Sequence, residues 1–214
     1  VNCRFAENIA NGGGGGLACN NSFNLSPDVI WNCLFINNSA SSGGGVYTSG
    51  KLIMTNSSFY NNTATIDGGG LRVDSNNRNH DIKNCIIWGN QPDSLQIASG
   101  ADITFCNIQG GYAGEGNIDV DPVFVSGPFG SLYLSQISSG QSIDSPCIDI
   151  GSAPAVDIEH EYISGSISMS DLTTRTDEGL DTGIVDLGYH YFFAGYQTPT
   201  PTPVPTMTPT PTMT

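Results

Sequence analysis

Residues 32–45 read Asn-Cys-Leu-Phe-Ile-Asn-Asn-Ser-Ala-Ser-Ser-Gly-Gly-Gly, and this pattern decides the fold because it occurs three times. An Asn-Cys-x-Phe motif is followed three residues later by Asn, then by Ala and a Gly triplet. The first copy starts at residue 2 and the third at residue 56, where Ser57 replaces the Cys; weaker copies follow at residues 84 and 106. A repeat of about two dozen residues is the signature of a solenoid, whose units bury their apolar faces by stacking.

Apolar residues alternate within each unit, which indicates strands. Cys33 alternates with Phe35, and Val46 with Thr48, so each pair lies on one face. A third apolar position precedes the Cys position by three residues, and this odd spacing requires a bend at the Asn between them. The composition, rich in Gly, Asn, Ser and Thr, disfavours helical repeats. We therefore predict an all-β fold: a right-handed parallel β-helix in residues 1–113, with about five coils and three short strands per coil.

Equivalent residues of successive coils should form ladders along the stack. Asn tolerates the left-handed backbone of a corner and can bond to an Asn one coil above, and the Gly triplets should supply corners with positive φ. The predicted ladder residues are Asn2, Asn32, Asn56 and Asn84; Asn8, Asn38, Asn62 and Asn90; Cys3, Cys33, Cys85 and Cys106; and Phe5, Phe35 and Phe59.

The six cysteines permit two interpretations. An extracellular chain with this number of cysteines invites a disulfide framework. Alternatively, the Cys column accepts Ser at position 57, and Cys19 shares a column with Thr48 and Val73, which is the behaviour of small buried side chains. We favour free thiols, because vertically adjacent residues with parallel Cβ vectors are slightly too far apart for a relaxed disulfide. No CxxC motif or His pair predicts a metal site at these thiols.

Charge and hydropathy restrict the partners. The formal net charge is −14 and the pI is about 4.1, which argues against binding to nucleic acid or to anionic membranes. No stretch approaches 18 apolar residues, so we expect no membrane span. The sequence opens on a coil without a signal peptide, so we expect the native N terminus to lie upstream or to have been processed.

Residues 114–196 lose the repeat and hold most of the acidic side chains. We predict that this region caps the stack, because an uncovered last coil exposes unpaired strand edges. Asp119 and Asp121 are candidates for a Ca²⁺ site because alternate residues share a side, although Asp in this context also forms Asx-turns. No other metal or cofactor is expected.

Four motifs in this region have a familiar arrangement. They occupy residues 114–124, 145–151, 175–177 and 185–189, the last reading Val-Asp-Leu-Gly-Tyr. They resemble the closing region of bacterial surface proteins called choice-of-anchor Q proteins, and the Asn-Cys-x-Phe units resemble the repeats of those proteins and of the polymorphic outer-membrane type. The resemblance implies a secreted or cell-surface β-helix of a bacterium, with no established activity.

The tail, residues 197–214, is almost pure Pro and Thr and cannot form a core. Its prolines favour an extended polyproline conformation. Its composition is that of a stalk carrying O-linked sugars, and a simple linker is the alternative. The candidate acceptors are Thr198, Thr200, Thr202, Thr206, Thr208, Thr210, Thr212 and Thr214.

We predict a noncatalytic extracellular structural protein that serves display, adhesion or fibre assembly, and whose partners are further copies of itself or cell-envelope polysaccharide. The alternative is a carbohydrate-active enzyme or glycan-binding module for acidic polysaccharide. A lyase or hydrolase needs clustered carboxylates with a cation, and a lectin needs exposed aromatic rings such as Tyr47 and Tyr60. The candidates for a charged face are Asp67, Asp74, Asp81, Arg72, Arg78 and Lys83, and the histidines, including His190, are isolated in the sequence.

Overall fold

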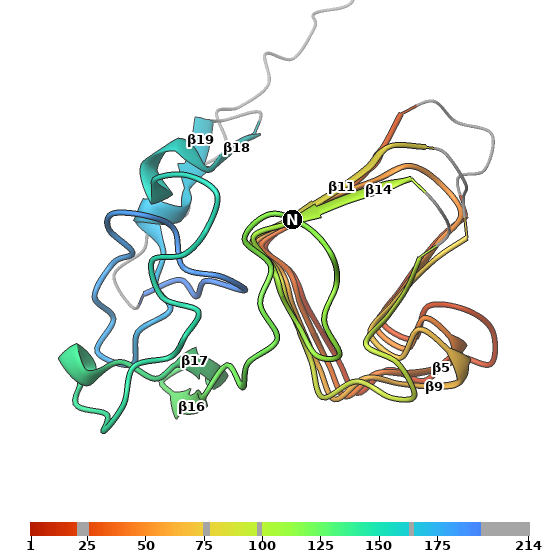
Figure 1. Ribbon diagram of the computed structural model, residues 1–214, viewed down its shortest axis with the longest axis horizontal. Helices are drawn as coiled ribbons and strands as arrows, with labels where there is room; N and C mark the ends of the chain where they lie inside the picture. Colours follow the sequence, from red (N-terminus) through yellow and green to blue (C-terminus); the bar gives the residue numbers. More distant parts are fainter. Residues whose placement is uncertain (21–25, 75–77, 98–99, 163–164, 194–214) are drawn as a thin grey trace, which may run out of the picture.

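The computed structural model describes residues 1–20, 26–74, 78–97, 100–162 and 165–193, and within these it is an all-β parallel solenoid, as predicted. Three parallel sheets run along the stack, and Figure 1 shows their coils lying one behind another. Sheet 1 contains β1 (Arg4–Ala6), β4 (Leu34–Ile36), β8 (Ser58–Tyr60), β12 (Ile86–Trp88) and β15 (Asn107–Ile108). Sheet 2 contains β2 (Leu17–Cys19), β6 (Val46–Thr48), β10 (Leu71–Val73) and β13 (Leu95–Ile97). Sheet 3 contains β3 (Asp28–Trp31), β7 (Leu52–Thr55), β11 (His80–Lys83) and β14 (Ala101–Thr104).

The smaller elements lie at one corner of the stack and in the C-terminal region. A parallel pair, β5 (Ser39–Ser42) and β9 (Thr63–Asp67), forms the corner between sheets 1 and 2. The C-terminal region contains the antiparallel pairs β16 (Phe124–Gly127) with β17 (Gly130–Leu134) and β18 (Glu159–Tyr162) with β19 (Gly165–Ser168). It also contains three short 3₁₀ helices, η1 (Ile137–Ser139), η2 (Ala155–Asp157) and η3 (Met169–Asp171). No helix long and apolar enough to cross a lipid bilayer occurs in the described part of the chain.

The register inside the stack is the one that the repeat predicts. Phe5 pairs with Phe35 and Phe35 with Phe59, and their ring centroids lie 4.8 and 4.6 Å apart. The inward residues of all three sheets form one core cluster in which Phe35 and Phe59 are fully buried. Because each coil alone exposes this apolar face, stacking of successive coils is the main source of stability.

The corners confirm part of the prediction about left-handed residues. Asn32, Asn56 and Asn84 have positive φ, between 45° and 55°, at the bend between sheets 3 and 1. In the second Asn column the prediction is wrong, because the left-handed residue comes one position earlier, as in Asn37 and Asn61. The preceding residue makes the turn at the surface, which leaves the Asn side chain free to point along the stack.

The Gly triplets have two separate roles. Gly43 has φ of +61°, in the left-handed region that disfavours side chains. Gly44 needs to be Gly for a different reason: a Cβ there would lie 2.4 Å from the carbonyl oxygen of Gly69 in the next coil. The triplet therefore permits both the turn and the close approach of neighbouring coils.

Only the first residues of the irregular C-terminal region cover the end of the stack. The N–H of Phe105 donates to the carbonyl of Glu115, and the N–H of Ile118 to that of Cys106, so residues 115–118 pair with the last coil. Residues 121–162 and 165–193 instead lie beside the stack, against the outer face of sheet 1 (Figure 1). The prediction that residues 114–196 form a cap is corrected for this larger part. The physical reason is that outward residues such as Leu34 and Ile86 are apolar and require a cover.

Candidate functional site

The first Asn column docks the C-terminal region onto the stack. Asn32 exchanges two hydrogen bonds with the backbone of His190: its Nδ2 donates to the carbonyl (2.9 Å) and its Oδ1 accepts from the N–H (2.7 Å). The Nδ2 of Asn56 donates to the carbonyl of Asp186, and Asn84 bonds to Ser152. Within this column, Asn32 bonds directly to Asn2, and Asn84 bonds directly to Asn56. This column thus joins two parts of the protein.

The second Asn column forms a continuous ladder. The Nδ2 of Asn8, Asn38 and Asn62 each donates to the Oδ1 of the next Asn, at 2.8–2.9 Å. Each of these oxygens also accepts a hydrogen bond from the backbone N–H of the same Asn whose Nδ2 it binds. The Nδ2 groups of Asn38 and Asn62 additionally reach the carbonyls of Phe5 and Phe35. The ladder therefore satisfies polar backbone groups at a buried corner, where unpaired groups are costly.

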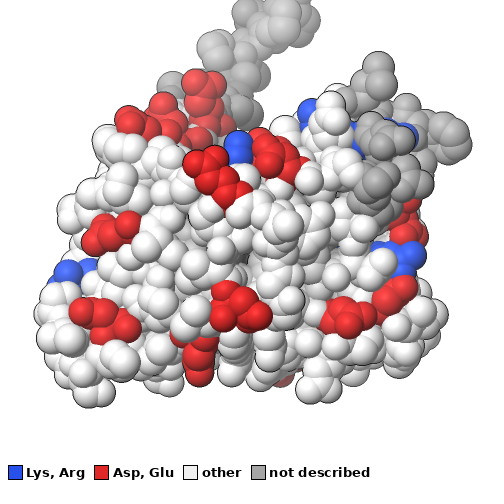
Figure 2. Space-filling model, in the orientation of Figure 1, with Lys and Arg blue, Asp and Glu red and all other residues white. Residues whose placement is uncertain are grey.

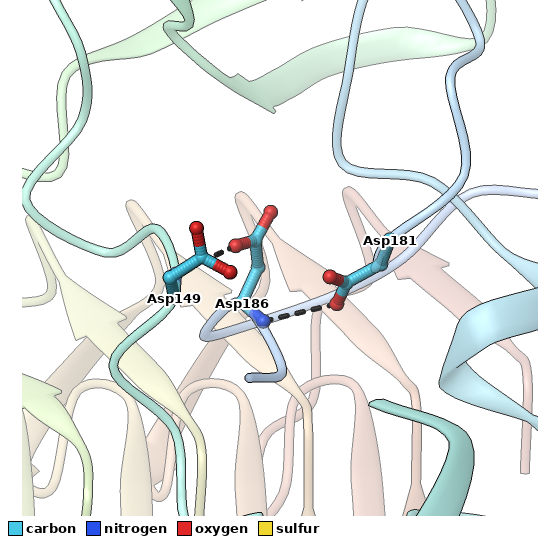
Figure 3. A group of neighbouring side chains, drawn as sticks. All are labelled: Asp149, Asp181 and Asp186. Atoms are coloured by element: carbon cyan, nitrogen blue, oxygen red, sulfur yellow. Dashed lines mark hydrogen bonds between the residues drawn. The ribbon is translucent and has the colours of Figure 1, made fainter. Parts of the chain in front are cut away.

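Three carboxylates converge where the C-terminal region contacts the first Asn column. Asp149, Asp181 and Asp186 bring oxygens within 4.8 Å of one another (Figure 3). Asp186 accepts the N–H of Asp149 at 2.8 Å, and its other oxygen accepts from Thr174 and Gln136. Asp181 accepts the N–H of Asp186 at 2.9 Å and the Nε2 of His190 at 2.7 Å. We call Asp181, Asp186 and His190 the buried triad.

Both ring nitrogens of His190 face acceptors. Nε2 contacts Asp181, and Nδ1 lies 3.0 Å from the carbonyl of Gly188, which can only accept a proton. An imidazolium satisfies both contacts at once. Burial alone lowers the pKa of His190, but the hydrogen bond and negative charge of Asp181 outweigh it, so the pKa is raised. Burial and the charge of Asp181 raise the pKa of Asp186 to about 6.

The space beside these carboxylates is small. A cavity of about 70 Å³, lined by residues that include Gln136, Asp149 and Arg175, opens next to Asp186. Liquid water occupies about 30 Å³ per molecule, so this space holds a few waters and no sugar ring. Carboxylate oxygens are the ligands that Ca²⁺ prefers, but both oxygens of Asp186 and the Oδ2 of Asp181 already accept protein donors. We therefore assign the buried triad a structural role in docking.

The triad makes the stability of the docked region depend on pH. Asp186 has a raised pKa, so its ionisation disfavours the folded state as the pH rises from about 4 to about 6. His190 also has a raised pKa, so its stabilising contribution is complete below about pH 6.5 and is lost as the pH rises through its higher folded value. Both effects have the same sign. We expect the thermal unfolding midpoint of the wild-type protein to fall between pH 5 and pH 8.

The matched control for this prediction is His190→Gln, which retains a donor for Asp181 but cannot titrate. Its unfolding midpoint should change less between pH 6.5 and pH 8 than that of the wild type. Equal slopes for the two proteins would show that general charge repulsion, and not the triad, sets the pH dependence.

The sequence-predicted Ca²⁺ candidates lie elsewhere. Asp119 accepts the N–H of Gly110, and Asp121 accepts that of Val123 two residues ahead, which is the Asx-turn interpretation. Ca²⁺ binding at these two residues stays a prediction. The sequence showed Asp149, Asp181 and Asp186 only as members of an acidic region, because their convergence depends on long-range docking.

The predicted charged face consists largely of paired charges. Arg72 contacts both Asp67 and Asp74, and Lys83 lies 3.1 Å from Asp81. Figure 2 shows carboxylates scattered over one face of the molecule, with few basic side chains among them. The carboxylates of this predicted face are therefore paired or dispersed, and the carboxylates that converge are Asp149, Asp181 and Asp186.

The two aromatic residues considered for glycan stacking already have protein partners. Tyr47 donates its hydroxyl to Asp74 at 2.9 Å. Tyr60 packs edge-on against Phe124 of the C-terminal region, with ring centroids 5.5 Å apart. Of the histidines, His80 accepts the N–H of Leu52, and His160 stacks on Trp31.

All six cysteines are free thiols in the structure. Cys33, Cys85, Cys106 and Cys147 are buried, whereas Cys3 is exposed. Cys147 is a packed interior residue that accepts a hydrogen bond from Asn107, and burial raises its pKa to about 11. Such a thiol is a poor nucleophile, because the thiolate is the reactive form. The tail threonines, residues 198–214, lie outside the described residues.

Comparison with known proteins identifies the repeats. Residues 32–49 and 56–74 match the Chlamydia polymorphic membrane protein (Chlamydia_PMP) repeat. No curated protein and no solved structure matches the chain significantly. The two matched segments each run from the bend before sheet 1 to sheet 2, so they contain the Asn ladder and the Gly triplet. The protein is therefore a β-helix repeat protein whose coils are similar to polymorphic membrane protein repeats.

Proposed function

We propose that this protein is a noncatalytic structural protein of a bacterial surface, where its β-helix serves display or adhesion. The observation that carries the proposal is the match of two consecutive coils to a repeat of polymorphic membrane proteins. The site geometry supports it, because the converging carboxylates are engaged in docking the C-terminal region onto the stack. The hydrogen-bonded Asn ladder and the parallel sheets make a scaffold that holds surface residues at regular positions.

Surface location is tested on intact cells of the bacterium that produces the protein. We expect an antibody against residues 1–193 to label unpermeabilised cells, and added protease to remove the label while a cytoplasmic marker stays intact. Protection of the protein from protease until the cells are lysed would rule out the proposal.

We further propose that residues 197–214 form a stalk with O-linked sugars, on the basis of their Pro-Thr composition. Mass spectrometry of the same native material should find hexose-type additions on peptides from this segment. Tail peptides that all have the unmodified mass would contradict the glycan part and leave the surface location unaffected.

A further inference from the structure

The end of the stack above sheet 2 is hollow. A cavity of about 700 Å³ is lined by residues 89–96 and 108–112. This volume lies within the range of ligand pockets, roughly 300–1,000 Å³. One wall is the coil segment that contains β13, and the opposite wall is the turn that follows β15.

The hollow exists because the chain takes a short path after β15. Asn107 bridges Ile118, only eleven residues later (118 − 107), whereas equivalent positions of the earlier coils are 21–30 residues apart. Eleven residues are too few to travel around sheets 2 and 3. The chain instead curves back inside the outline of the earlier coils (Figure 1), and no described strand covers the outer edge of β13.

A series of backbone hydrogen bonds ends at this edge. In sheet 2 the N–H of Leu17 donates to Gly45, that of Val46 to Gly70, and that of Leu71 to Ser94. Leu95 is the next donor in the series. The carbonyls of Cys19 and Thr48 likewise accept a backbone N–H from the following coil. Val73 and then Ile97 hold the equivalent positions in the next two coils. By this register the N–H of Leu95, which lines the hollow, and the carbonyl of Ile97, just beyond the lining segment, lie on the outer edge of β13 without a described strand partner.

The apolar column and the Asn ladder end at the same place. Leu71 and Val73 are fully buried, whereas Leu95 and Ile97, their equivalents in β13, are only partly buried. Asn90 is the last member of the second Asn column, and it lines the hollow. The outer edge of β13, the partly buried Leu95 and Ile97, and the end of the Asn ladder together offer the same kinds of contact that one coil offers to the next.

We propose that this hollow binds an extended peptide segment of a partner protein, which adds a parallel strand to β13 and places two apolar side chains over Leu95 and Ile97. The support is continuity with the inter-coil interface, whose register defines both the direction of the strand and the alternation of its side chains. A glycan fits less well, because it lacks backbone groups at the spacing of a strand. Among the described lining residues only Asp93 is charged, so the segment needs no charge of its own. This inference does not depend on the proposed surface location.

The probe is a fluorescent peptide with the sequence of residues 62–74, which carries the Asn, the Gly triplet and the Leu-x-Val pair that sheet 2 uses. We expect saturable binding to the full 214-residue chain by fluorescence anisotropy. A peptide with Leu71→Asp, at an inward position, should bind at least about tenfold more weakly. A peptide with Arg72→Ser, at the adjacent outward position, should bind within about twofold of the parent.

Protein variants provide the second arm. Leu95→Asp in the protein should weaken binding at least about tenfold, whereas Ile66→Asp, at an exposed residue that does not line the hollow, should leave it unchanged. Because the peptide variants cannot unfold the protein, they decide the case if Leu95→Asp destabilises the stack. Absence of saturable binding, or equal binding of the Leu71→Asp and parent peptides, would overturn the proposal, as would binding of neutral oligosaccharides in the hollow without binding of the peptide.

Discussion

Replacing Phe35 with Ala is expected to lower the free energy of unfolding by about 3–5 kcal/mol. Phe35 is completely buried, and its ring lies between those of Phe5 and Phe59, at centroid distances of 4.8 and 4.6 Å. The neighbouring rings are fixed by strand pairing above and below, so the stack cannot close the space that the lost ring leaves. The change therefore removes both apolar burial and the contacts of two aromatic neighbours. Urea unfolding, followed by circular dichroism, measures the difference.

Phe129→Ala is the matched control, because this Phe lies on the C-terminal region and is 48% exposed. Its effect should stay within about 0.5 kcal/mol of zero. A loss for Phe35→Ala no larger than that of Phe129→Ala would mean that the aromatic column does not carry the stability of the stack.

The sequence predicted the stack well because its information is local and repeated. A pattern such as Asn-Cys-x-Phe states in each coil which side chains face inward, and stacking places equal positions above one another. The Phe column and the three parallel sheets follow from that rule alone. The error at the second Asn column was one residue, because either of two adjacent positions, Asn37 or Asn38, could have made the turn.

The docking of the C-terminal region could not be predicted in the same way. Asn32 contacts His190 across 158 residues, and no periodic signal links the two positions. One indication was available: the outward positions of sheet 1, such as Leu34, Ile36 and Ile86, are apolar, which is unusual for a solvated face. The buried triad depends on this docking, so it was hidden for the same reason.

The hollow above β13 also could not be predicted from the repeat, because it lies where the spacing between coils becomes irregular. Short spacing between Asn107 and Ile118 is visible in the sequence only once the bridge between them is known. Spacing within the repeat thus predicts coils, and a departure from that spacing marks the place where a partner segment can join them.

Replacing Asn62 with Ala should be nearly as destabilising as the loss of Phe35, although the side chain is polar. Its Oδ1 accepts the backbone N–H and the Nδ2 of Asn38, and its Nδ2 donates to the carbonyl of Phe35 and the Oδ1 of Asn90. All of these contacts lie in a buried corner, and each unsatisfied buried group costs about 1–3 kcal/mol. Partial relaxation reduces the sum, so we expect a loss of about 3–4 kcal/mol in the free energy of unfolding, measured by urea denaturation.

The neighbouring Asn61 is exposed and left-handed, so Asn61→Gly keeps the turn and should change stability by no more than about 0.5 kcal/mol. Similar losses for the two variants would place the stabilising role in the turn itself, whereas a loss confined to Asn62→Ala assigns it to the ladder that connects the coils.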